Sequence, residues 1–406
     1  MAFAVAIAGL AAIPAWSQPR TPHLRPAQAS DEGGLWGLSD KAEQQARQSA
    51  ERNRDPALND YVAGIVAKLA PEYNGDIRVY VMDRPFLNAT MTPSGYTEVW
   101  SGLLLRAESE DQLAFVLGHE ISHFAENHSI EAYRAMKSRA QATMALQLAV
   151  TVVAAGAAIN TGSAQNSADI MRTASSVNDL LYLSQISAYF GFSRENEKQA
   201  DALGFGRAVA AGYDPHAGAT MWRRLVAETQ ASSFKKVRDQ EARGSLFSTH
   251  PVSAERIAAL DALASKASKA TTVDRRAYRT MIRPHLPAWL KDDLRRRDPG
   301  ESLALIERLS ALGEDLGVLA FYRGEVHRQR RQNDDLVKAR QAYAAATAEP
   351  DAPLSAWRAL GDLAAQAGDK PAAQAAYQDY LARAPQASDR WLVESSLDAL
   401  AEGTTL

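Results

Sequence analysis

The chain has 406 residues, a net charge of −3, 46% hydrophobic residues and no cysteine. This length and hydrophobic content are sufficient for two or three packed domains, and the near-neutral charge excludes the basic footprint of a nucleic-acid-binding protein. The absence of cysteine excludes disulfides and a thiolate-rich structural zinc site. Any metal site must therefore be built from nitrogen and oxygen ligands.

The first seventeen residues carry the pattern of a signal peptide. An apolar run of small residues, 2–13, is followed by Ala15-Trp16-Ser17, which resembles a signal-peptidase site. No lysine or arginine precedes the run, so a transmembrane anchor is the competing interpretation, although the run is short for one. We therefore expect export, with residues 1–17 as the signal peptide. The Pro-, Ser- and Gly-rich residues 18–38 are expected to form a flexible lead-in.

Residues 39–105 predict two helices and a small sheet. Apolar residues recur at helical spacing through 39–70, with one interruption at Asp55-Pro56. Ile77–Met82 alternates and is rich in β-branched residues, and Tyr96–Trp100 follows turn residues, so both are predicted strands. The free edge of such a sheet could pair with an extended peptide, but an ordinary packed strand fits the sequence at least as well.

Ser109–Glu126 predicts an amphipathic helix that carries a metal-binding pattern. It starts with capping-box spacing and continues with apolar residues at helical intervals. His119 and His123 lie four residues apart, so both imidazoles project from one face and can hold one ion. Glu120 is offset by one helical step, which suits a general base for a metal-bound water. The alternative is a chance match on a buried helix, but the capped, periodic context favours the metal site.

Residues 140–159 carry no charged side chain. The segment is rich in alanine and short for a membrane span. A buried helix or a helical hairpin is therefore expected, with peripheral membrane contact as the alternative.

Ser193–Gly204 predicts a second helix that supplies acidic groups. Glu197 and Asp201 lie four residues apart on one face. Glu197 is the best candidate for the third metal ligand, and Asp201 is placed to hydrogen-bond the far nitrogen of a ligating histidine. By itself this pattern is more typical of a solvated charged face. Only its combination with the two histidines makes it a prediction of ligands.

Three segments together resemble a known family. HEISH, SRENEKQAD and 248–256 (STHPVSAER) are similar, in this order, to the signatures of the HtpX-like and CaaX-prenyl-protease-like zinc metallopeptidases. Within that family the likeness is to a periplasmic enzyme with a carboxy-terminal repeat domain, and it covers about residues 40–265.

This resemblance implies one Zn²⁺ per chain, held by His119, His123 and Glu197. It also implies that Glu120 is the general base and that Asp201 supports a ligand. It selects Glu197 rather than Glu195, because the family's ligand stands four residues before the Asp of an Ala-Asp pair.

His250 and Arg256 lie in the third of these segments. The resemblance gives His250 two conflicting roles: a fourth zinc ligand that blocks the water site at rest, or a donor to the oxyanion of the tetrahedral intermediate. We favour a loop that does each in turn. Arg256 is expected to pair with Glu197 or Asp201. The remaining histidines are not expected to take part. His128 is predicted to point away from the site, and no ligand-spaced partner accompanies His23, His216, His285 or His327.

The sequence beyond residue 270 is Ala-rich and helical, with a period of 34 residues. The residues that recur are Asp335, Ala339 and Tyr343, matched by Asp369, Ala373 and Tyr377. Ser355–Pro385 is therefore predicted to be a tetratricopeptide repeat, 320–350 a weaker one and 286–318 a degenerate first copy. Stacked repeats present a concave surface for peptides or proteins, whereas unrelated helices are the alternative.

We therefore expect a mainly α protein. An α+β zincin-like metallopeptidase domain with a small sheet spans 39–268, and an all-α tetratricopeptide-repeat domain spans 269–406. The expected function is a periplasmic zinc endopeptidase that acts on misfolded or misassembled envelope proteins. The alternative is a repeat-based chaperone for outer-membrane assembly with little proteolytic activity. The sequence favours the enzyme, because every residue that hydrolysis needs is present. A partnership with the outer-membrane assembly machinery is implied by the resemblance alone.

Overall fold

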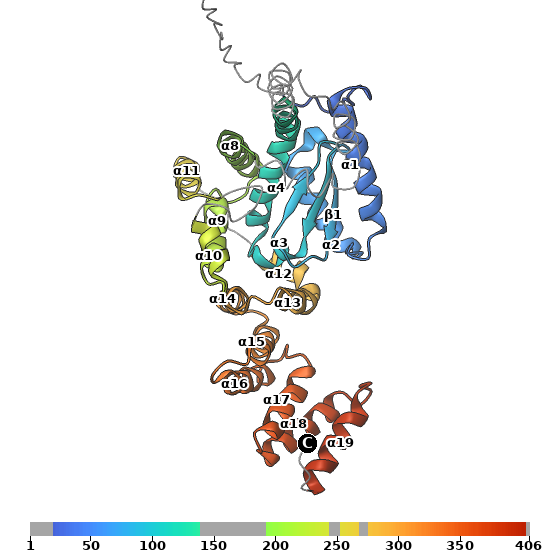
Figure 1. The fold of residues 1–406 in the computed structure, drawn as a ribbon, viewed down its shortest axis with the longest axis vertical. Coiled ribbons are helices and arrows are strands. Elements are labelled where there is room, and N and C mark those ends of the chain that lie inside the picture. The colour runs from blue at the N-terminus through green and yellow to red at the C-terminus, as the bar shows by residue number, and fades with distance from the viewer. Residues whose placement is uncertain (1–18, 139–191, 243–251, 268–274, 403–406) are drawn as a thin grey trace, which may run out of the picture.

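A computed structural model describes residues 19–138, 192–242, 252–267 and 275–402. The described chain is mainly helical, with one small mixed sheet, which confirms the expected fold class (Figure 1). The first range contains α1 (Asp31–Gln48), α2 (Pro56–Leu69), a short 3-10 helix (Pro71–Tyr73), β1 (Arg78–Met82), β2 (Ala89–Met91), β3 (Tyr96–Trp100), α3 (Ser101–Arg106) and α4 (Glu110–Ala125).

The second and third ranges contain α8 (Arg194–Ala210), α9 (Ala217–Gln230), α10 (Lys235–Ala242) and α11 (Ala254–Ala264). The last range contains α12 (Arg275–Ile282), a 3-10 turn (Arg283–His285), α13 (Leu286–Leu294), α14 (Pro299–Ser310), α15 (Leu316–Arg330), α16 (Asp335–Thr347), α17 (Ser355–Gln366), α18 (Lys370–Arg383) and α19 (Arg390–Glu402).

The sheet has the strand order β1-β3-β2 and lies beside α4. β1 pairs parallel with β3, and β2 pairs antiparallel with β3, with Ala89 opposite Val99. Both predicted strands are present. Residue patterns alone did not predict β2, because three residues are too few to show a period. At the turn before β3, Gly95 has a φ of 82°, and a Cβ there would lie 2.2 Å from the Asp76 carbonyl oxygen.

The amino-terminal residues are more ordered than the sequence suggested. α1 begins at Asp31, within the stretch expected to be a flexible lead-in, and Ser30 caps it by accepting a hydrogen bond from the Gly33 amide. Arg20, which is 8% exposed, donates from its backbone to the Ala125 carbonyl at 2.7 Å and from its Nε to the Phe124 carbonyl at 3.3 Å. Both bonds satisfy carbonyls at the carboxy-terminal end of α4. The positive charge of the Arg20 side chain also suits the negative end of a helix.

α12 and α13, the first two helices of the last range, contact the part of the chain before residue 268. α12 packs on α2 and α4, and the hydroxyl of Tyr278, 1% exposed, donates to the Leu104 carbonyl at 2.6 Å. Trp289 on α13 donates from its indole to Asp83 at 2.9 Å. The expected boundary at 268/269 stays a prediction.

α15–α16 and α17–α18 are two helix pairs that repeat the same contacts. Gly324 and Gly361 leave space for tyrosine rings, since a Cβ would lie 2.4 Å from Tyr343 and 2.6 Å from Tyr377. Each tyrosine hydroxyl donates to the acidic residue that follows the glycine, Glu325 at 2.5 Å and Asp362 at 2.8 Å. The 34-residue spacing thus corresponds to a repeated structural unit, while its assignment to the tetratricopeptide class stays a prediction.

No helix in the described ranges is long and apolar enough to cross a membrane. The predicted signal peptide and the 140–159 segment lie outside those ranges, so the expectation of membrane contact there stays a prediction.

Glu43 fastens α1 to the sheet and generates a pH-dependent prediction. Burial alone would raise its pKa, but hydrogen bonds from Arg78, Tyr80 and Arg47 lower the pKa to about 2. A lowered pKa stabilises the fold above pH 4.5, and this contribution is lost as the pH falls toward 2. We expect Glu43→Gln to reduce the free energy of unfolding of the metal-free protein by about 3 kcal/mol at pH 7.

Urea unfolding of both proteins from pH 7 to pH 2 measures this effect. The difference between them should shrink as the pH falls, and a difference that stays constant with pH would contradict it. Glu51→Gln is the matched control, because the ion pair of Glu51 with Arg84 is half exposed and is worth less than about 1 kcal/mol.

Candidate metal centre

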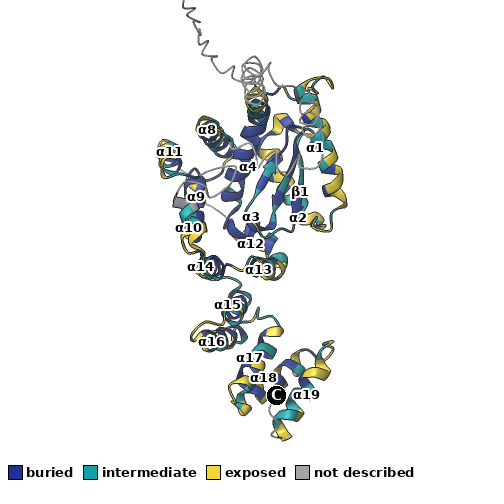
Figure 2. Cartoon of the chain, in the orientation of Figure 1, coloured by how far each residue is buried: buried dark blue, intermediate teal, exposed yellow. Residues whose placement is uncertain are grey.

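α4 is the buried helix that carries both histidines of the predicted site. The Ser109 hydroxyl caps it by accepting from the Gln112 amide, and every residue from Gln112 to Ala125 is buried. Figure 2 shows this burial along α4, in contrast to the exposed outer face of α1. The apolar face packs into the core, and His119 and His123 face the buried side of α8. The sequence therefore places two imidazoles in the interior, where only paired or ligating polar groups are tolerated.

α8 approaches α4 closely because glycines meet at the contact. A Cβ on Gly118 would lie 2.9 Å from the Gly204 carbonyl oxygen, and a Cβ on Gly204 would lie 2.7 Å from the His119 amide nitrogen. Asp201 and Glu197 lie about one and two turns earlier on α8, so the close contact brings their carboxylates beside the histidines. α8 itself begins with a capping box between Ser193 and Asn196.

His119, His123 and Glu197 form a buried group whose ligand atoms all lie within 4.8 Å of one another. The two Nε2 atoms are 3.1 Å apart, and the Glu197 oxygens lie 3.6 Å from the His119 Nε2 and 3.5 Å from the His123 Nε2. Ligands at 2.0–2.1 Å in a tetrahedron around zinc lie about 3.3–3.4 Å apart. Two imidazoles and one carboxylate at these separations therefore fit a catalytic zinc site. No other such group occurs within the described ranges.

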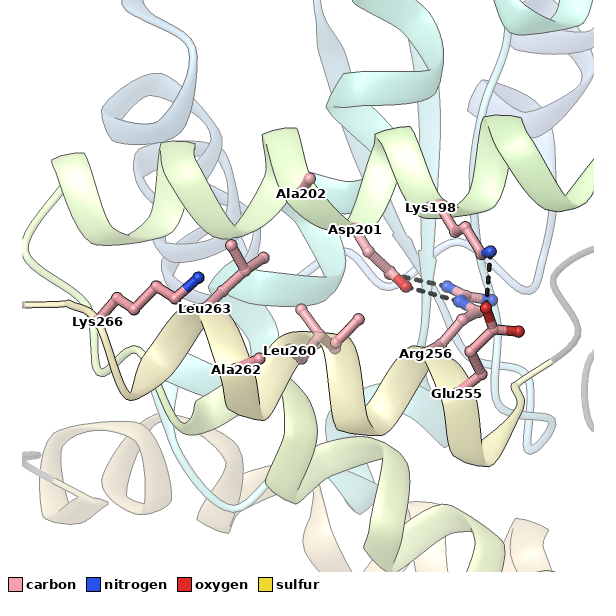
Figure 3. A pocket seen from close by; sticks show the side chains of 10 residues that line it. Lys198, Asp201, Ala202, Glu255, Arg256, Leu260, Ala262, Leu263 and Lys266 are labelled. Atoms are coloured by element: carbon pink, nitrogen blue, oxygen red, sulfur yellow. Dashed lines mark hydrogen bonds and ion pairs between the residues drawn. The ribbon is translucent and has the colours of Figure 1, made fainter.

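Asp201 and Arg256 support this group on the side of His119. The Asp201 carboxylate lies 3.0 Å from the His119 Nδ1, so the Nδ1–H is held and Nε2 is left for a metal. Arg256 donates to Asp201 at 2.6 and 2.8 Å (Figure 3). Its third nitrogen lies 2.6 Å from Glu197. Burial would raise the pKa of Asp201, but the hydrogen bonds from Arg256 and His119 outweigh it and lower that pKa. The carboxylate therefore stays ionised as an acceptor.

His128 supports the group on the side of His123, and the expectation that it points away is wrong. Its Nδ1 lies 3.0 Å from the His123 Nδ1, and the residue is 2% exposed. The expectation extended the helical period past the end of α4. The helix stops at Ala125, and Asn127 has a φ of 56°, so the helical period is broken and His128 lies beside His123 instead. An asparagine just after a helix is a stop signal that the sequence does carry.

Two aromatic rings pack against the ligand imidazoles. The Trp222 ring, on α9, meets the His119 ring edge to face at 6.3 Å, and the Arg256 guanidinium lies 5.7 Å from the centre of the same indole. Phe192 stacks on the His123 ring at 4.0 Å. These contacts restrict rotation of both imidazoles.

A cavity of about 360 Å³ lies between α8 and α11, and Figure 3 shows the side chains that line it. Asp201 and Arg256 line one end, with the ion pair between Lys198 and Glu255, and Lys266 lines the other. His119, His123 and Glu197 do not line this cavity, so it is not the space in which a metal-dependent reaction would occur.

The structure thus brings together five of the predicted site residues: His119, His123, Glu197, Asp201 and Arg256. Glu120 is buried on α4, directly after His119. His250 lies outside the described ranges. The roles of Glu120 and His250 stay predictions.

Comparison with known proteins places this geometry in a family. The profile described as peptidase family M48 matches residues 52–264. The chain is 26% identical over 229 residues to the beta-barrel assembly-enhancing protease of Escherichia coli K12, covering 54% of this chain and 42% of the relative. It is 30% identical over 208 residues to a Vibrio cholerae protein that carries the same name provisionally, covering 50% and 38%.

A third relative is the mitochondrial metalloendopeptidase OMA1 of Schizosaccharomyces pombe, 30% identical over 180 residues, or 44% of each chain. The chain spans less than half the length of each of these relatives. The family resemblance drawn from the three motifs is confirmed.

Arg256 generates a prediction about stability in the absence of metal. It is the cation beside two buried carboxylates, and its removal leaves them uncompensated. We expect Arg256→Met to destabilise the metal-free protein by about 3–5 kcal/mol. Added zinc should offset part of this loss, because the ion supplies positive charge next to Glu197.

Urea unfolding in EDTA and in excess zinc measures both effects. Arg223→Met is the matched control: its ion pair with Asp261 is about half exposed and is worth at most about 1 kcal/mol. Equal losses for the two variants, or a loss at Arg256 that zinc leaves unchanged, would show that charge compensation is not its role.

Proposed function

The chain belongs to peptidase family M48. We propose that it is a zinc-dependent endopeptidase. The observation that carries the proposal is the spacing of the His119 and His123 nitrogens and the Glu197 carboxylate, which matches three corners of a zinc tetrahedron. Three protein ligands leave the fourth position for water or substrate, as in catalytic rather than structural zinc sites.

Each residue of the site has a defined task in this proposal. Zinc held there would lower the pKa of a water toward about 7 and polarise the scissile carbonyl. Glu120 takes the proton from that water and passes it to the leaving amine, since it is adjacent to His119 on the same helix. Asp201 holds the ring of His119, and Arg256 keeps Asp201 and Glu197 charged and in place.

β2 supports a binding mode for the substrate backbone. It is an edge strand that pairs only with β3 among the described residues, and it packs on α4. An extended peptide could add to this edge through main-chain hydrogen bonds, which recognise a backbone and not a particular side chain. This mode suits an endopeptidase that acts on unfolded or misassembled chains.

The proposed setting is the periplasm, with misfolded or misassembled envelope and outer-membrane proteins as substrates. Support comes from the signal-peptide pattern of residues 1–17 and from the beta-barrel assembly-enhancing proteases among the relatives. The two helix pairs, α15–α16 and α17–α18, would act as tetratricopeptide repeats that recruit substrates or the outer-membrane assembly machinery.

Glu120→Gln tests the proposed reaction. The substitution removes the proton acceptor but keeps the size of the side chain, so we expect casein hydrolysis to fall by at least about 100-fold. The zinc content and the unfolding midpoint should stay unchanged. A cleanly purified Glu120→Gln protein that hydrolyses casein at the wild-type rate would refute the assignment.

His250→Ala tests the proposed switch. If His250 blocks the water site at rest, its removal should raise casein hydrolysis severalfold above wild type, while His216→Ala, at an exposed histidine, should change nothing. Activity at or below wild type would contradict a purely blocking role, because loss of an oxyanion donor would itself lower hydrolysis. If no variant hydrolyses any protein with zinc present, the repeat-based chaperone becomes the better function.

A further inference from the structure

His128 follows a two-residue turn after α4 and begins the next helical segment, beside the metal group. After α4 ends at Ala125, Asn127 adopts a left-handed conformation with a φ of 56°. The Arg20 guanidinium holds this turn by donating to the Asn127 side-chain oxygen at 2.7 Å. The His128 ring is buried, and its Nδ1 lies 3.0 Å from the Nδ1 of His123, the ring nitrogen that faces away from the other ligands.

When a metal is bound, the hydrogen bonds that link His123, His128 and Gln199 can have only one arrangement of donors and acceptors. The Nε2 of His123 faces the ligand group, so its Nδ1 must carry the proton and donate. The Nδ1 of His128 must then accept. A neutral imidazole that accepts at Nδ1 carries its proton on Nε2, and that nitrogen lies 3.2 Å from the Gln199 side-chain oxygen.

Gln199 and Glu126 complete the chain. The Gln199 amide nitrogen donates to the Glu126 carboxylate at 2.9 Å. Because an ionised carboxylate only accepts, this bond fixes the orientation of the amide and turns its oxygen toward His128. Gln199 belongs to α8, the helix of Glu197, so the chain also connects the end of α4 to the element that supplies the third ligand.

We propose that His128 is a positioning residue that holds His123 as a metal ligand by accepting its Nδ1–H as a neutral, Nε2-protonated imidazole. The inference rests on the proposed zinc site. It makes the two histidine ligands unequal: His119 donates to the charged Asp201 carboxylate, whereas His123 donates to a neutral ring. A carboxylate partner raises the basicity of a ligand more than a neutral partner does. His123 is therefore the more weakly held imidazole.

His128→Leu removes the acceptor and keeps a buried side chain of similar size. We expect it to weaken Zn²⁺ binding by about 10–100-fold, the usual effect of losing a hydrogen-bond partner of a metal ligand. His128→Gln can accept from His123 with its oxygen and donate to Gln199 with its nitrogen. It should restore the affinity to within about threefold of wild type, and this rescue separates positioning from packing.

The full chain is purified metal-free, and its affinity for Zn²⁺ is measured by competition with a chromogenic chelator. The visible absorption of the Co²⁺ form gives a second readout, because it reports ligand geometry independently of hydrolysis. The spectrum should change in His128→Leu and return in His128→Gln. His327→Leu is the matched control: it removes another buried histidine, which is hydrogen-bonded to Asp335, and should leave Zn²⁺ affinity and the Co²⁺ spectrum unchanged.

The outcomes separate this inference from the proposed function. A wild-type protein that does not bind Zn²⁺ at all overturns both. Wild-type binding with no loss in His128→Leu, or an equal loss in His128→Leu and His128→Gln, overturns the positioning role alone. If His128→Leu does not fold, Gln199→Met takes its place, since loss of the Nε2–H acceptor should weaken Zn²⁺ binding severalfold; an unchanged affinity there also overturns the inference.

Discussion

The metal group depends on one steric constraint, the backbone contact between Gly118 on α4 and Gly204 on α8. Neither position has room for a Cβ, so the two helices approach more closely than side chains would permit. At this distance a short carboxylate, Asp201, reaches the His119 ring at 3.0 Å, and Glu197 reaches both imidazoles. A small displacement of α8 would move both carboxylates together and separate the ligands.

Charge is the second constraint on the site. Glu197 and Asp201 are 2% and 4% exposed, and two buried carboxylates side by side are costly unless cations accompany them. Arg256 supplies one positive charge from α11, and the proposed zinc ion supplies more. α11 is thus part of the site although it carries no ligand, because its first turn presents the guanidinium to both carboxylates. The site is assembled from three helices that are far apart in the sequence.

Residue patterns predicted the elements whose structure follows from their own sequence. They did not predict features that depend on contacts between distant segments. α4 is capped and periodic, so its ligand pair could be predicted from the sequence. β2 is three residues long and exists through its pairing with β3, which leaves no local period. His128 was missed because its position depends on where α4 stops. The start of α1 was missed although Ser30 followed by two acidic residues is a helix-start signal.

α13, which contacts α15 of the first helix pair, is linked to one wall of the site. α9 carries Trp222, which packs on His119. Glu228, further along α9, accepts from Arg106 on α3 at 2.7 Å. Arg106 also donates to Asp293 on α13 at 2.7 Å, and all three groups are less than 5% exposed. Buried ion pairs of this kind add little net stability, but breaking one is costly, so they fix relative positions. If the repeats recruit substrates as proposed, α13 connects them to this wall through its contact with α15, and a bound chain must be extended enough to reach the site. That requirement agrees with recognition of unfolded backbone at the edge of β2.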